Sequence, residues 1–155
     1  MEIQVSKLRE TLNLLQPVVP KKAVLPVIGY VYLGNGRAMT TNLEIAVKVD
    51  LPEASEPMLL PVMGAQAFLE TIPGHRMVTI TVKEKGVMLT SGTMEAEFTT
   101  GDPEDFPPIQ RGDFEHDAVL NGEALVKALV TVLDCSAKED TRPVLHGICL
   151  TTGDE

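Results

Sequence analysis

The chain repeats its own pattern at an offset of 117 positions, and this repeat limits the possible folds more than any other feature. Residues 118–155 align with residues 1–38 without a gap. The identical pairs are Leu8 and Leu125, Leu12 and Leu129, Lys21 and Lys138, Pro26 and Pro143, Val27 and Val144, Leu33 and Leu150, and Gly36 and Gly153. Hydrophobic character is kept where identity is lost, as at Ile3 and Leu120. A repeat at this spacing indicates a modular protein, and chance similarity between two strand-helix-strand units is the alternative.

The repeat divides the chain into two segments of unequal completeness. Residues 1–115 form one whole module, which is long enough to bury a core in a chain that is 44% hydrophobic. Residues 116–155 hold only the beginning of a second module, and about 40 residues without disulfides or metal seldom fold alone. We therefore expect one complete domain followed by a truncated strand-helix-strand copy of its start.

The charge of the chain is distributed unevenly. The net charge is −9, yet residues 1–38 carry +3 while residues 39–117 carry −9. An acidic protein does not adhere to nucleic acid over its whole surface, but a locally positive face can approach DNA. Scattered, solvated charges are the alternative reading of the same distribution.

The sequence also indicates a compartment. No apolar run reaches the length of a membrane span, and the N-terminus lacks the order of a signal peptide. Two cysteines, Cys135 and Cys149, indicate free thiols in a reducing compartment, with a bridge between them as the alternative. We expect a soluble, cytoplasmic protein.

Hydrophobic periodicity predicts two similar half-units within residues 1–110. In the first, a strand over residues 1–5 and an N-cap at Ser6 precede a helix with a stripe at Leu8, Leu12 and Leu15. A strand over residues 25–33, a hairpin turn over residues 34–36 and further strands over residues 38–51 follow. In the second half-unit we expect a strand over residues 58–61, a helix over residues 62–72, and strands over residues 78–82, 87–89 and 94–100. Two helices on one face of antiparallel sheets, an α+β domain, follow from this order.

The sequence offers little that converges for catalysis. The three histidines lie in separate segments, and none belongs to a recognisable nucleophile motif. His146 and Cys149 have a spacing that could ligate metal, but on an expected strand they would point to opposite faces. The acidic cluster of Asp102, Glu104 and Asp105 could bind a hard cation or form a solvated turn, and the prolines around it favour the turn. We expect no enzyme, no metal and no cofactor. The loop at Lys21 and Lys22 can pair with phosphates or be a solvated loop.

Four segments, in order and at the right spacing, resemble the β sliding clamps of bacterial DNA polymerase III. They are Leu25-Pro26-Val27-Ile28, Thr41-Asn42-Leu43-Glu44-Ile45, Asp105-Phe106-Pro107-Pro108, and Thr141-Arg142-Pro143-Val144-Leu145-His146-Gly147. The resemblance covers essentially the whole chain. It implies the DNA-clamp fold, and an offset of 117 residues is what three domains of like fold per subunit predict.

The family implies a function by topology. A homodimeric ring encircles double-stranded DNA without sequence preference and tethers DNA polymerase III, and the clamp loader binds the same protein. The expected role is therefore a non-catalytic processivity factor of DNA replication, with no membrane partner. The alternative is a stand-alone, clamp-derived module that dimerises through its sheet edges and never encircles DNA.

The resemblance also implies site residues. Lys22 matches a basic loop residue that contacts DNA, Arg142 occupies the matching loop of the second module, and Lys7 and Arg9 on the first helix are candidates for the lining of the hole. The implied subunit interface includes Ala96 and Phe98, with Gly64 in place of a basic residue. Leu145 matches one wall of the cleft that captures partner peptides.

The rest of that cleft would lie beyond Glu155, so we expect a fragment of a clamp that does not close a ring alone. The expected strand over residues 144–151 would then present an exposed edge that pairs with another chain.

Overall fold

The computed structural model describes residues 1–109, 119–137 and 142–151. The chain divides into unit 1, Met1–Gln110, and unit 2, Arg111–Glu155. The expected domain boundary between residues 115 and 116, and the polar stretch over residues 111–117, lie outside the described residues. The boundaries of the two domains therefore stay a prediction.

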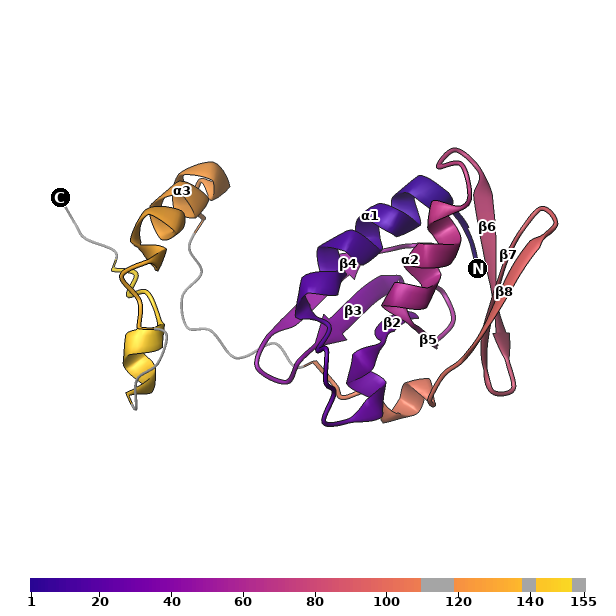
Figure 1. Cartoon of the computed structure of the whole chain (residues 1–155), viewed down its shortest axis with the longest axis horizontal. Coiled ribbons are helices and arrows are strands. Elements are labelled where there is room, and N and C mark those ends of the chain that lie inside the picture. Colours follow the sequence, from indigo (N-terminus) through magenta and orange to yellow (C-terminus); the bar gives the residue numbers. More distant parts are fainter. Residues whose placement is uncertain (110–118, 138–141, 152–155) are drawn as a thin grey trace. The chain divides into compact units, whose positions relative to one another are not determined.

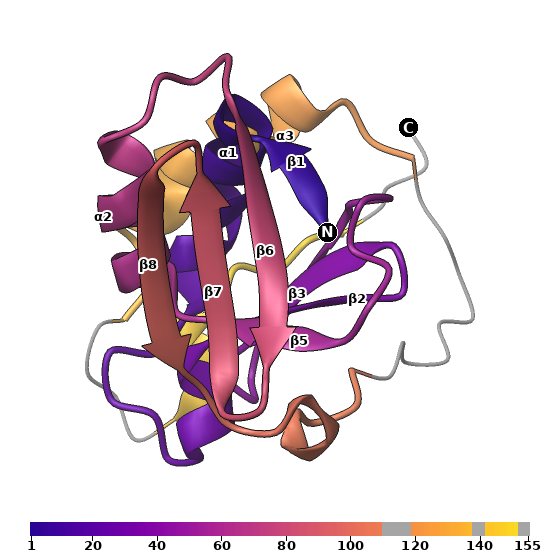
Figure 2. The same ribbon diagram turned by 90° about the vertical axis from the view of Figure 1, so that its right-hand side faces the viewer.

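Unit 1 consists of two helices and two four-stranded antiparallel sheets (Figures 1 and 2). The helices are α1 (Val5–Leu15) and α2 (Val62–Glu70). The first sheet has the order β1-β6-β7-β8 and comprises Glu2–Gln4, Met77–Lys83, Gly86–Ser91 and Met94–Thr99. The second has the order β4-β3-β2-β5 and comprises Ala46–Asp50, Arg37–Thr41, Val31–Gly34 and Met58–Leu60. The predicted α+β domain with two helices and antiparallel sheets is confirmed.

The two half-units exchange their first strands. β1 pairs with β6 in the sheet of the second half, where Ile3 lies opposite Val78. β5 pairs with β2 in the sheet of the first half, where Leu60 lies opposite Val31. The elements follow one another along the chain in the order that the two predicted half-units require. Each sheet, however, takes one strand from the other half, so neither half has a complete sheet alone.

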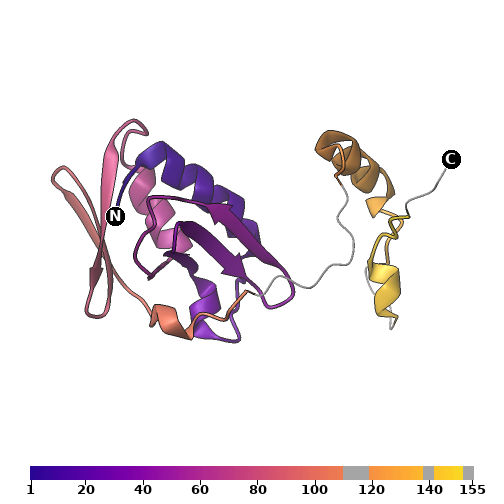
Figure 3. The same ribbon diagram turned by 180° about the vertical axis from the view of Figure 1, so that it is seen from behind.

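α1 and α2 lie side by side on the same side of the sheets (Figure 3). Leu8, Leu12 and Leu15 have no exposed surface, which confirms the predicted stripe. The predicted N-cap at Ser6 is wrong, because the helix begins at Val5 and Gln4 holds the N-cap position without a side-chain bond. The amides of Val5 and Ser6 donate instead to the carbonyls of Arg76 and Gly74, each at 2.9 Å. Carbonyls of a neighbouring turn thus accept the hydrogen bonds from the free amides at the start of the helix, in place of a side-chain cap.

The predicted strand over residues 25–33 is only partly formed. Pro26–Gly29 is a 3₁₀ helix (η2), and β2 begins at Val31. Pro26 has no amide hydrogen to give to a sheet, and its ring suits the first position of a helical turn. The predicted hairpin turn is confirmed: Asn35 and Gly36 have φ of 54° and 72°, as a type I′ turn requires.

Two clusters of buried side chains hold unit 1 together. The larger one lies between the helices and both sheets and includes Ile3, Leu12, Leu33 and Leu69. The smaller one comprises Val27, Ile28, Tyr32, Leu59 and Phe106. The rings of Tyr32 and Phe106 are 5.4 Å apart, so the segment after β8 packs on β2.

The described part of unit 2 repeats two helices of unit 1, α1 and η2, and contains no strand. α3 (Gly122–Leu133) begins 117 residues after α1, and the 3₁₀ helix η4 (Pro143–His146) begins 117 residues after η2. The expected strand over residues 144–151 is wrong, because η4 takes its first part and the described residues that follow form no strand. In unit 1, β1 and β2 exist because β6, β3 and β5 pair with them. The described part of unit 2 contains no counterpart of those strands.

Candidate functional site

The basic loop of Lys21 and Lys22 lies between the 3₁₀ helix η1 (Gln16–Val18) and η2. Both side chains are exposed. Within the described part of the chain, neither lysine forms an ion pair with an acidic side chain. Their charges are therefore available to an anionic partner such as a phosphate.

The two candidates on α1 are held by other parts of unit 1. The Lys7 Nζ atom lies 2.5 Å from Glu53 Oε1, and this hydrogen bond lowers the pKa of Glu53 below its ordinary value. The Arg9 guanidinium donates through Nη2 to the carbonyl of Leu69 and, at 2.5 Å, to the carbonyl of Ile72. Both carbonyls lie at the end of α2, where a positive charge is favoured by the helix dipole. Arg9 therefore joins the two helices.

Arg142 is exposed and occupies the N-cap position of η4. Under the offset of 117 its counterpart is Leu25, the N-cap residue of η2. The counterpart of Lys22 is residue 139, which lies outside the described residues. Arg142 and Lys22 thus belong to corresponding loops but not to equivalent positions.

Phe98 and Ala96 lie on β8, an edge strand of the first sheet. They lie opposite Val87 and Leu89 of β7. The Phe98 ring is half-buried against the larger core cluster. A Cβ atom added at Gly64 would lie 2.6 Å from Cε1 of that ring. The ring therefore occupies the space of a side chain at position 64, a contact between α2 and β8 that the sequence reading missed.

Leu145 lies in η4 and is 39% exposed. Val126 and Val130 are more exposed, with 60% and 64%, whereas Leu125, Leu129 and Ile148 are half-buried. α3 has no buried residue. Cys135 and Cys149 are both free and exposed.

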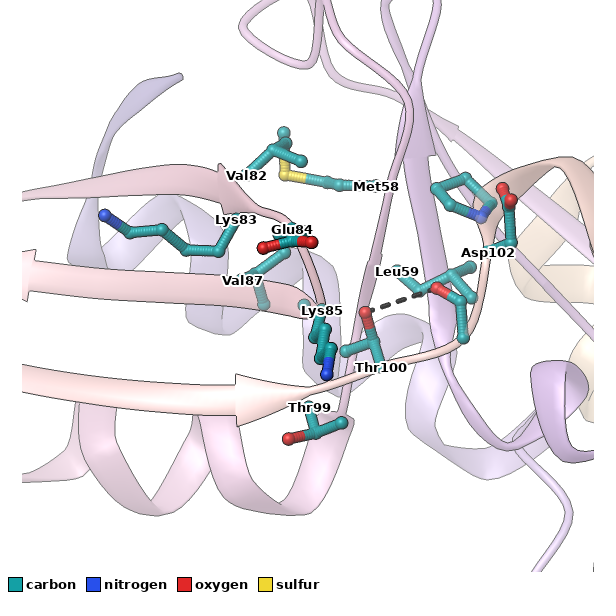
Figure 4. A pocket seen from close by; sticks show the side chains of 13 residues that line it. Met58, Leu59, Val82, Lys83, Glu84, Lys85, Val87, Thr99, Thr100 and Asp102 are labelled. Atoms are coloured by element: carbon teal, nitrogen blue, oxygen red, sulfur yellow. Dashed lines mark hydrogen bonds between the residues drawn. The ribbon is translucent and has the colours of Figure 1, made fainter.

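A cavity of about 480 Å³ lies where β5, the β6–β7 turn and the end of β8 meet (Figure 4). Its charged lining residues are Lys83, Glu84, Lys85 and Asp102. Lys83 and Asp102 lie at opposite sides of the view (Figure 4).

The acidic cluster after β8 forms a capped turn. The Asp102 carboxylate accepts from the amide of Glu104 at 2.9 Å and caps the 3₁₀ helix Pro103–Asp105. In residues 1–109, 119–137 and 142–151, no group of three His, Cys, Asp or Glu side chains is placed to hold a metal ion. Across the same ranges, no helix is long and apolar enough to cross a membrane.

A groove that the sequence reading did not predict lies where α1 ends and α2 begins. Its volume is about 750 Å³. Twelve residues line it: Gln16, Pro17, Val18, Val19, Pro20, Lys21, Ala23, Gly29, Asn42, Pro61, Val62 and Met63. We call it the α1–α2 groove. Its residues come from four separate segments, so no local pattern in the sequence could reveal it.

The sequence matches no protein-family model and no curated protein. Solved structures do match. DNA polymerase III subunit beta from Pseudomonas aeruginosa superposes with a TM-score of 0.83 at 23% identity, over 95% of this chain and 42% of that one. The beta subunit from Streptococcus pyogenes gives 0.79 at 18% identity, over 92% and 41% of the two chains. The sliding clamp from Bacillus subtilis gives 0.77 at 18%, over 92% and 42%.

The chain thus spans about 42% of the length of these proteins. The agreement covers 95% of this chain, so it includes residues of both units. The chain therefore has the fold of the bacterial sliding clamps, which confirms what its sequence motifs predict.

Proposed function

We propose that this chain provides the first domain and part of the second domain of a DNA sliding clamp. The observation that supports this most strongly is the agreement with DNA polymerase III beta subunits over 95% of the chain. The offset of 117 residues between α1 and α3 supports the proposal independently, because this offset is observed within the chain and does not depend on a comparison with other proteins. We propose that the whole protein to which this chain belongs encircles DNA.

A clamp acts by topology and needs no catalytic group. Enclosed duplex cannot leave sideways, so weak contacts to phosphate permit sliding while a tethered polymerase stays on its template. Phosphate contacts position a protein without reading bases.

We propose Lys22 and Arg142 as the DNA contacts of this chain. Both are exposed, and both lie in loops that precede a 3₁₀ helix at corresponding places of the two units. Lys7 is a weaker candidate because reaching a phosphate would require it to leave Glu53. We assign Arg9 to the support of α2, since its guanidinium already binds two carbonyls there.

We propose that β8 forms part of a subunit interface in a homodimeric ring. β8 is a sheet edge, and its outer backbone groups pair with no strand among residues 1–109. Ala96 is half-exposed beside Phe98. We also propose that Leu145, in the whole protein, forms one wall of a cleft for polymerase and clamp-loader peptides.

Salt-dependent binding to duplex DNA tests the assigned contacts. Lys22→Gln and Arg142→Gln should weaken binding by a similar factor on unrelated sequences. Each should also reduce the slope of log K against log salt by about 0.9. Lys85→Gln, which removes the same charge from the exposed β6–β7 turn, is the matched control and should leave the slope unchanged. A loss that depends on the DNA sequence would contradict the assignment.

A further inference from the structure

The α1–α2 groove combines an apolar lining with one exposed methionine. Valine, proline, alanine and methionine provide most of its surface. Met63, which lines it, is 77% exposed. Large apolar side chains gathered at a concave surface are typical of a binding site.

The polar lining of the groove has a definite chemical character. The Asn42 Oδ1 atom already accepts from the amides of Glu44 and Ile45, at 3.0 and 2.7 Å. The Asn42 Nδ2 donor has no partner among the described residues. The Lys21 Nζ atom adds three more donors and makes no ion pair there. No aspartate or glutamate lines the groove.

Gln16 also lines the groove, and its Oε1 atom accepts from Gln66 Nε2 at 3.2 Å. The lining therefore offers a cation and neutral amide donors beside apolar walls. A ligand that matches it has an apolar body, one anionic group and one neutral acceptor. The end of a peptide with apolar residues has all three, because its terminal carboxylate is anionic and its backbone carbonyls accept hydrogen bonds. A volume of about 750 Å³ lies within the range of about 300–1,000 Å³ that binding pockets occupy.

We propose that the α1–α2 groove binds the apolar C-terminal end of a partner polypeptide. The terminal carboxylate pairs with Lys21, a backbone carbonyl accepts from Asn42, and the apolar side chains contact Val62 and Met63. This site goes beyond the proposed clamp function. It lies within unit 1 and uses neither the DNA candidates Lys22 and Arg142 nor the cleft residue Leu145.

Fluorescence anisotropy with the full 155-residue chain tests this proposal. The probe is the pentapeptide Gly-Gly-Val-Leu-Leu, labelled at its amino end, with either a free carboxylate or an amide at its carboxyl end. We expect the amidated peptide to bind about fivefold more weakly, which is the effect of about 1 kcal/mol from one exposed ion pair. Lys21→Gln should weaken the carboxylate peptide by the same factor and leave the amidated peptide unchanged. Met63→Gln should weaken both peptides.

Lys22→Gln is the matched control, since it removes an equal charge from the neighbouring position outside the lining. An equal loss from Lys22→Gln would mean general attraction to a basic loop and would overturn the proposal. Equal binding of the two peptides, or no binding at 1 mM peptide, would overturn it as well. Octanoate that competes as strongly as the peptide would assign the groove to aliphatic acids instead. All three substituted side chains are exposed, so circular dichroism should show unchanged folding.

Discussion

Arg9 provides the sharpest test of how unit 1 is held together. Its Nη2 atom donates to the carbonyls of Leu69 and Ile72 at the end of α2. The Leu69 carbonyl also accepts from the amide of Ile72 at 3.0 Å, so only the Ile72 carbonyl depends on Arg9 alone. Arg9→Met removes both bonds while it keeps an unbranched apolar stem against the helices.

The expected cost follows from these contacts. A hydrogen bond to a charged group contributes about 1.5–3 kcal/mol, and the charge at the helix end adds about 0.3–1 kcal/mol. The Arg9 Nε atom is buried without a partner in the described residues, which costs free energy that the substitution recovers. We therefore expect Arg9→Met to lower the free energy of unfolding by about 2 kcal/mol. Arg9→Lys keeps the charge but loses the planar fork, so we expect a loss of about 1 kcal/mol.

Tyrosine fluorescence during urea unfolding measures this loss in unit 1 alone. The chain has no tryptophan and two tyrosines, and both Tyr30 and Tyr32 lie in unit 1. With a slope of about 1–2 kcal/mol per molar urea, the midpoint of Arg9→Met should fall by about 1–2 M. Lys22→Met removes the same charge from an exposed loop and should change the free energy by less than about 0.5 kcal/mol. An equally small change in Arg9→Met would refute the role of the guanidinium.

Three further predictions concern contacts elsewhere in the chain. Gly64→Ala should lower the free energy of unfolding by about 1–3 kcal/mol, because its Cβ would lie 2.6 Å from the Phe98 ring. In a Phe98→Ala background the same substitution should be neutral or stabilising. Equal losses in both backgrounds would contradict the contact. Because Lys7 holds the pKa of Glu53 low, the pair stabilises the fold at neutral pH, and this contribution is lost as pH falls below about 5. Between pH 6 and pH 3, the urea midpoint should therefore fall less in Lys7→Met than in the unsubstituted chain. An identical fall in both proteins would contradict the pair. Leu12→Ala should cost unit 1 about 2–5 kcal/mol, because the Leu12 side chain is fully buried; an unchanged urea midpoint in the tyrosine fluorescence would contradict this packing.

The helices and turns of unit 1 were predictable because their signals are local. The leucine stripe of α1 recurs at helical spacing, and Asn35-Gly36 has the backbone freedom that a type I′ turn requires. The 3₁₀ helix at residues 26–29 was missed because its valine and isoleucine are typical of strands. In this case the fixed ring of Pro26 outweighs their preference.

The features that remained hidden depend on contacts between distant segments. Nothing in the sequence of β1 shows that it pairs with β6, more than 70 residues away, rather than with β2. The true partner of Arg9 is likewise at the end of another helix. A strand over residues 144–151 was expected from the repeat, yet a strand forms only where a neighbour pairs with it. The α1–α2 groove is likewise lined by residues from four separate segments of the chain.

Retention on circular DNA tests the central proposal most directly. The native protein that carries this sequence is loaded by its clamp loader onto a nicked circular plasmid and passed through a sizing column at high salt, before and after the plasmid is cut once. We predict that the protein elutes with the circle and is lost from the linear form, because a ring can slide off free ends. Equal retention on circular and linear DNA would contradict encirclement and would favour a module that binds without enclosing the duplex.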